Sequence, residues 1–149
     1  MEEKNVLLQI KPIKYGTTAY RSEVLLRDKV LRKPLGMSLF DENLASEKYD
    51  QHIGAYIGTT LVGVLILTEL NNENIKMRQV AVDEKWRNRK IGNEMVAYTE
   101  EYCRRMGYKT MVLNARKAAV AFYEKLGYRK ISEEFTEIGI PHYKMIKEI

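Results

Sequence analysis

The chain has 149 residues, which is the usual length of one domain and enough to form a single sizeable core. Hydrophobic residues make up 45% and charged residues 30%, which is the composition of an ordinary soluble globular protein. No stretch approaches the length of a membrane span: the longest apolar run, residues 61–67, is short and contains Gly63, so it predicts a buried strand.

The net charge of +5 favours anionic partners, without choosing between nucleic acid, lipid and a phosphorylated small molecule. The single cysteine, Cys103, excludes an internal disulfide and a CxxC or Cys/His zinc site, and we expect no bound metal. The N-terminal residues begin with acids and lack the basic and apolar regions of a signal peptide. A lone thiol without a leader predicts a cytoplasmic protein.

In chain order, the pattern predicts a strand, a helix, three strands, a helix, a strand, a helix and two final strands. The expected ranges are 6–13, 18–30, 52–57, 61–70, 76–82, 91–106, 110–113, 118–126, 128–135 and 138–146. The helix from residue 91 is defined by one apolar face, formed by Ile91, Met95, Tyr98, Tyr102 and Met106. Residues 37–51 look irregular, with a short helical turn. This order predicts the α+β class, a mixed sheet with helices packed on it, in one domain over 1–149.

A dense basic segment, residues 85–90, lies between the strand 76–82 and the helix from 91. A turn that opens a helix presents unpaired backbone N–H groups and partial positive charge, so it can hold an anion. Arg87, Arg89 and Lys90 would add full charges, and Gly92 would let a phosphate approach the first helical turn. The segment is neither a P-loop nor a GxGxxG fingerprint. The interpretations that remain are a diphosphate site and a solvated basic loop.

This strand–loop–helix, with Arg87-Asn88-Arg89-Lys90-Ile91-Gly92, resembles the R/Q-x-x-G-x-G/A motif of the GNAT superfamily of N-acetyltransferases. Residues 119–128, AVAFYEKLGY, are similar to the later AxxFYxKxGF segment of that superfamily. Residues 31–36 and the ending with Ile138-Gly139-Ile140-Pro141-His142 are similar to its ElaA/YjcF-like branch. The resemblance spans nearly the whole chain and implies a GNAT-like acyl-CoA N-acyltransferase fold, with a mixed, mostly antiparallel central sheet flanked by helices.

The resemblance also implies a reaction and a co-substrate. An acetyl group would move from acetyl-CoA (coenzyme A) to a primary amine, on a small molecule or a peptide, by direct attack in a ternary complex without a metal. The residues implied to bind coenzyme A are Val80, Ala81, Val82, Arg87, Asn88, Arg89, Lys90, Ile91, Gly92, Asn93, Asn114, Phe122 and Tyr123.

Two positions depart from the superfamily pattern. Lys90 stands at the first motif glycine, where it either adopts an ordinary helical conformation and adds charge or weakens cofactor binding. Arg116 stands where many members have an asparagine, and the nearby Asn114 offers that polar contact instead.

The predicted catalytic residues are Tyr123 and His142. By its position in the motif, Tyr123 would donate a proton to the departing thiolate; the alternative is that it packs against Phe122. His142 would be the base, because its ordinary pKa suits proton transfer near neutral pH; equally, it closes a hydrogen bond in the fold.

Weaker candidates for the base are His52, Glu69 and Asp83. A backbone N–H near Val82 would stabilise the developing oxyanion. A covalent role for Cys103 is disfavoured, since a lone helical cysteine is usually packing.

Two other functions compete with the transferase. One is a module that binds coenzyme A or a nucleotide without chemistry; the other is a small basic nucleic-acid-binding domain, which the missing aromatic platform disfavours. We therefore expect no nucleic-acid or membrane partner. A homodimer through the last strands is plausible.

Overall fold

The computed structural model describes residues 7–149, so Val6 and the acidic N-terminal residues lie outside the described part. The strands are β1 (Leu8–Ile13), β2 (Gln51–Ile57), β3 (Thr60–Glu69), β4 (Asn74–Val82), β5 (Thr110–Arg116), β6 (Arg129–Lys130), β7 (Phe135–Glu137) and β8 (Ile140–Glu148). The helices are α1 (Thr18–Leu31), α2 (Ile91–Arg105) and α3 (Val120–Lys125). Short 3-10 turns are η2 (Lys33–Leu35), η3 (Leu39–Asp41), η4 (Ala45–Tyr49), η5 (Glu84–Trp86) and η6 (Lys117–Ala119).

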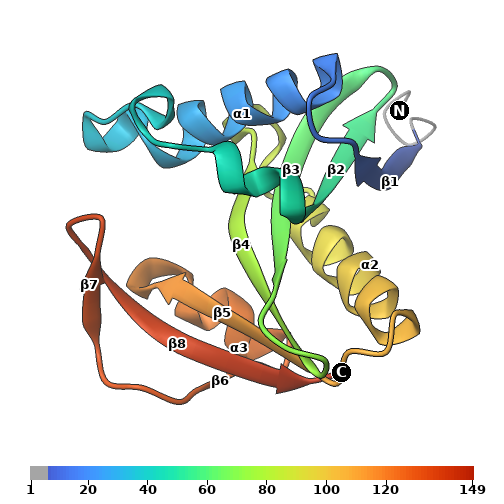
Figure 1. Ribbon diagram of the computed structural model, residues 1–149. Helices are drawn as coiled ribbons and strands as arrows, with labels where there is room; N and C mark the ends of the chain where they lie inside the picture. The colour runs from blue at the N-terminus through green and yellow to red at the C-terminus, as the bar shows by residue number, and fades with distance from the viewer. Residues whose placement is uncertain (1–6) are drawn as a thin grey trace.

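The strands form one sheet in the order β1-β2-β3-β4-β5-β8-β6, with β7 added beside β8. Every pairing is antiparallel except that of β4 with β5. The predicted α+β class, with a mixed and mostly antiparallel sheet, is therefore confirmed. The helices lie on both faces of this sheet: α1 covers one face, and α2 and α3 cover the other (Figure 1).

The pairing of β4 with β5 is short, and the two strands then diverge. They are paired only from Asn74↔Thr110 to Lys76↔Val112, although β4 continues to Val82 and β5 to Arg116 (Figure 1). A bulge lies just beyond this point in β4, where Gln79 has a φ of 54°. The register with β3 shifts there, and Gln79 and Val80 have no paired residue in β3. The sheet consequently opens in a V between β4 and β5.

Helix α2 packs the predicted face against the core except at its last residue. Ile91 and Met95 are buried as expected, but Met106 is 47% exposed and Cys103 is fully buried. Tyr98 and Tyr102 are partly buried against the core cluster, whereas Met106 lies past the last helical residue, Arg105. No helix in the described residues is long and apolar enough to cross a membrane.

The C-terminal strands also differ from the prediction. The expected strand 128–135 is interrupted: only Arg129–Lys130 and Phe135–Glu137 pair with β8, and residues 131–134 between them are irregular. Along one edge, β8 pairs with β5 from His142 to Glu148. Along its other edge, β7 pairs with its beginning and β6 with Met145 and Ile146, so the two short strands cover that edge one after the other.

Candidate active site

The loop between β4 and α2 has a left-handed backbone at two residues that are not glycine. Asn88 has a φ of 65°, and Lys90 has φ 62° and ψ 22°. The expectation that Lys90 takes an ordinary helical conformation is therefore wrong. The left-handed region costs a residue with a side chain roughly 1–2 kcal/mol, so the loop keeps, with a lysine, the backbone path that a glycine adopts freely.

The first turn of α2 lacks a side-chain cap. Lys90 occupies the capping position and its side chain offers no acceptor. The N–H groups of Ile91, Gly92 and Asn93 precede the first intrahelical bond, from Glu94 N–H to Lys90 C=O at 3.0 Å. Together with the charges of Lys90 and Arg87, they form a site for an anion.

A groove runs from this helix end between β4 and α3; we call it the α2 groove. Most of the predicted cofactor residues line it, namely Val80, Val82, Arg87, Asn88, Lys90, Ile91, Gly92, Asn93, Phe122 and Tyr123, joined by Trp86, Ala118 and Ala119. A Cβ added at Gly92 would lie 3.3 Å from Phe122 Cζ, so the groove is narrow at this point and a side chain at residue 92 would have to displace the Phe122 ring slightly.

Three predicted cofactor residues lie elsewhere. The side chain of Ala81 is buried on the opposite face of the sheet, in the small cluster beneath α1. Arg89 lies 4.8 Å from the centre of the Trp86 ring and lines another groove, with Tyr98. Asn114 lines a separate cavity beside β5.

This second cavity, the β5–β8 cavity, encloses about 150 Å³. It is lined by Leu31, Arg32, Met77, Gln79, Val80, Leu113, Asn114, Ala115, Arg116, Ala119, Tyr123, Glu137, Ile138 and His142. It shares Val80, Ala119 and Tyr123 with the α2 groove. The two sites therefore meet in the V between β4 and β5, at Tyr123.

The Tyr123 ring is packed while its hydroxyl lacks a partner. The residue is 7% exposed and its ring makes edge contacts with Phe122 and Tyr128, at centroid distances of 5.0 and 5.7 Å. Within the described chain, its hydroxyl forms no hydrogen bond, unlike that of Tyr128, which donates to Glu100 at 2.8 Å. Burial raises the pKa of Tyr123, so the hydroxyl keeps its proton at neutral pH.

Both interpretations of His142 agree with the geometry, because each ring nitrogen has a different neighbour. Nδ1 lies 2.9 Å from the carbonyl oxygen of Ile140, and Nε2 lies 3.7 Å from Glu137 Oε2. The ring stacks on Phe135 and is 3% exposed, yet it lines the β5–β8 cavity. If Nδ1 is protonated and donates a hydrogen bond to the Ile140 carbonyl oxygen, Nε2 has the free lone pair of a base.

Glu137 is a site residue that sequence reasoning missed. Its carboxylate accepts a hydrogen bond from Asn114 Nδ2 at 3.1 Å and lies beside His142. The turn at Ile138-Gly139 was the available signal, since a hairpin there places Glu137 next to the final strand.

The weaker base candidates have other partners. His52 lies in a buried cluster with Glu23 and Glu47 and lines neither site. Glu69 accepts a hydrogen bond from the Tyr108 hydroxyl, and Asp83 pairs with Lys29 and caps η5. Cys103 is fully buried, and burial, with a smaller effect of Glu100, raises its pKa to about 12, so its thiol is not a nucleophile at neutral pH.

Comparison with known proteins agrees with this geometry. Residues 27–149 match the family described as acetyltransferase (GNAT) domain. The N-acetyltransferase YjcF of Bacillus subtilis is 31% identical over 124 residues, which cover 83% of this chain and 88% of YjcF. The crystal structure of Escherichia coli ElaA superposes with a TM-score of 0.78 at 22% identity, over 96% of this chain and 99% of ElaA. A GNAT family acetyltransferase from Elizabethkingia anophelis, solved with acetyl-CoA bound, gives 0.71 at 21% identity, over 95% of this chain and 98% of that one.

The fold and the family match together define an acyl-CoA-dependent N-acetyltransferase with the GNAT fold. The chain belongs to the GNAT acetyltransferase family, in its ElaA/YjcF-like branch.

Proposed function

We propose that the chain moves the acetyl group of acetyl-CoA to a primary amine by direct attack, with both substrates bound at once. The observation that carries this proposal is the meeting of two separately lined sites at one unpaired tyrosine hydroxyl, that of Tyr123. The α2 groove would take the cofactor, and the β5–β8 cavity would take the amine.

The α2 groove fits coenzyme A in its charge and shape. The uncapped N–H groups of Gly92 and Asn93, with Arg87 and Lys90, suit a diphosphate. The lining runs from this anion site past Val80 and Val82 to Tyr123, so a slender chain bound along it would reach the V. Coenzyme A would supply the acetyl thioester there.

The protein's own groups would move two protons. As the amine nitrogen bonds to the acetyl carbon and the carbon–sulfur bond breaks, His142 Nε2 would accept the proton that the amine loses. Tyr123 would donate its proton to the sulfur that leaves. Gln79 and Val80 lie off the β3 ladder, and a backbone N–H at this bulge would stabilise the charge that develops on the acetyl oxygen.

The test is release of free thiol from acetyl-CoA in the presence of a panel of small amines, polyamines and peptides. We expect Tyr123→Phe to lower kcat by about 100-fold or more while its acetyl-CoA affinity stays near that of the wild type. Tyr102→Phe is the matched control, because the Tyr102 hydroxyl lies far along α2 and, among the described residues, bonds only to Gln51. An unchanged kcat in Tyr123→Phe would overturn the acid assignment.

Initial-rate kinetics test the order of events. Direct attack predicts intersecting double-reciprocal lines when both substrates are varied, whereas an acetylated enzyme predicts parallel lines. Tight binding of coenzyme A without thiol release for any amine would favour the module that binds without chemistry.

A further inference from the structure

The β5–β8 cavity contains a guanidinium group that forms no ion pair with a carboxylate of the described residues. Arg116, at the end of β5, is partly buried and donates from Nη2 to the carbonyl oxygen of Leu31 at 3.0 Å. Arg32 lies beside it and donates to the same oxygen at 3.3 Å, but its Nε also binds Glu42 Oε2 at 2.7 Å. Of these two arginines, only Arg116 lacks an ion pair within the described chain.

Arg116 has more hydrogen-bond donors than it has acceptors among the described residues. A guanidinium carries five N–H donors, and the Leu31 oxygen accepts one of them. Burial, and after it the neighbouring charge of Arg32, lower the pKa of Arg116, and the charge of Glu137 offsets only part of this, so the cation lies where its charge is disfavoured. A bound anion would relieve both effects.

The cavity also contains a negative charge, on the carboxylate of Glu137. The Glu137 carboxylate is held by Asn114 and lies 3.7 Å from His142 Nε2. Arg116 and His142 are directly paired in the β5–β8 ladder, so the cationic and the acid–base groups share one face of the sheet. The cavity thus offers a place for a negative group and a place for an ammonium group.

We propose that the acceptor is a small amine that also carries a carboxylate, that Arg116 binds this carboxylate, and that Glu137 and His142 receive the amino end. This inference rests on the proposed function and names its substrate class. A carboxylate matches the paired N–H groups of arginine in a bidentate geometry, which lysine cannot reproduce.

A structural role for Arg116 makes a different prediction. Leu31 ends α1, and a cation near a helix C-terminus is stabilising. If capping α1 is all that Arg116 does, replacing it will lower the melting temperature and leave the choice of acceptor unchanged.

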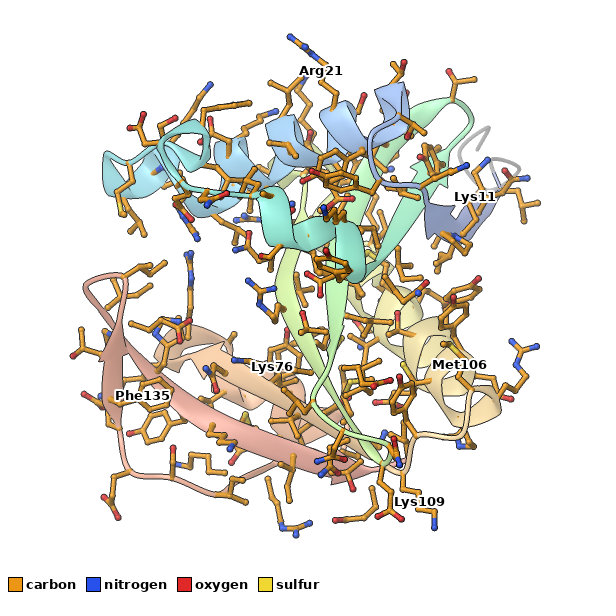
Figure 2. All side chains as sticks on the ribbon, viewed as in Figure 1. Lys11, Arg21, Lys76, Met106, Lys109 and Phe135 are labelled. Atoms are coloured by element: carbon orange, nitrogen blue, oxygen red, sulfur yellow. The ribbon has the colours of Figure 1, made fainter. Side chains whose placement is uncertain are left out.

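The experiment compares amines in pairs that differ only in the acid group: α- and ω-amino acids against their carboxamides, and phosphoethanolamine against ethanolamine. For each pair, kcat/KM is measured by thiol release in the wild type and in Arg116→Gln. Because the quantity compared is a ratio between two enzymes, the intrinsic basicity of each amine cancels. Arg21→Gln is the matched control, since it removes the same charge from the outer side of α1, where the side chain projects away from the molecule (Figure 2).

We expect the ratio of kcat/KM for a carboxylate to that for its carboxamide to fall by about tenfold or more from the wild type to Arg116→Gln, and to stay unchanged in Arg21→Gln. Acetyl-CoA affinity should be the same in all three proteins. A ratio that is the same in the wild type and in Arg116→Gln would overturn the proposal while leaving the acetyltransferase intact. A preference for phosphoethanolamine over every carboxylate would overturn it in favour of a phosphate. Absence of thiol release with every amine would instead contradict the proposed function.

Discussion

Arg27 Nε donates a hydrogen bond of 3.0 Å to Gln79 Oε1, which joins the bulge of β4 to a buried cluster of charges beneath α1. Within this cluster, Arg27 also binds Glu23 at 3.0 Å and Glu47 at 2.9 and 2.6 Å. His52 Nδ1 lies 2.8 Å from Glu23 Oε2. Gln79, which lies at the bulge of β4, is thus held by Arg27 of α1, and Arg27 is itself fixed by Glu23 of the same helix and Glu47 of η4.

The first prediction concerns the stability that this cluster provides. Arg27→Met removes the buried cation and leaves the carboxylates of Glu23 and Glu47 facing each other without it, so we expect the free energy of unfolding to fall by about 3–5 kcal/mol. Urea unfolding measures the change. Lys29→Met is the matched control on the same helix: its pair with Asp83 is exposed and should contribute about 1 kcal/mol or less. Similar losses in the two variants would contradict a special role for the cluster.

The second prediction is a pH dependence of stability. Burial opposes a charge on His52, but the hydrogen bond and the charge of Glu23 outweigh it and raise the pKa of His52 above its usual 6.5. A raised folded pKa means that this contribution is complete below pH 6.5 and is lost as the pH rises through the folded pKa. From pH 6.5 to 9, the wild type should therefore lose stability relative to His52→Gln, by at most about 1.4 kcal/mol per pH unit. If the free energies of unfolding of the two proteins change equally with pH across this range, the effect is ruled out.

The third prediction separates the charge of Lys90 from its backbone. Lys90→Ala removes the charge and keeps a side chain in the left-handed region, whereas Lys90→Gly removes both the charge and the strain. Lys90→Gly should be more stable than Lys90→Ala by about 1 kcal/mol, as measured by urea unfolding. Both variants should bind coenzyme A more weakly than the wild type, with a smaller dependence on salt. An equal stability of the two variants would show that the left-handed backbone carries no strain.

The fourth prediction concerns the narrow point of the α2 groove. Gly92→Ala places a Cβ 3.3 Å from Phe122 Cζ, so we expect the affinity for coenzyme A to fall. Stability should change little, because alanine is a better helix former than glycine by about 1 kcal/mol and this offsets the crowding. Phe122→Leu in the Gly92→Ala background should restore part of the affinity, and calorimetric titration of the two single variants and the double variant measures the coupling. Additive losses would mean that the two residues do not share the constriction.

Much of this architecture could be predicted from the sequence because it depends on local patterns. Gly58 and Gly107 mark a hairpin and a helix end, and the alternation of apolar residues indicates the inner strands. The anion site of the α2 groove could also be predicted, since its strand, basic loop and helix are contiguous in the chain.

Other features depend on pairings between distant segments, which local patterns do not contain. Glu137 reaches the β5–β8 cavity only through the register of β7 on β8, and Arg116 faces His142 only through that of β8 on β5. The cluster of Arg27 with Gln79 likewise joins residues that are 52 positions apart. For the same reason, the interruption of the strand predicted at 128–135 was missed: it follows from how β8 shares its edges.

The short pairing of β4 with β5 divides the sheet into two half-sheets that share a seam of three residue pairs. One half contains the β4 bulge and the anion loop, and the other contains Arg116 and His142. A ligand bound in the V as proposed would touch both halves and so add a connection across the seam. Cohesion between the two parts of the molecule would then depend on occupancy of the site, and the substrates would help to hold the sheet together.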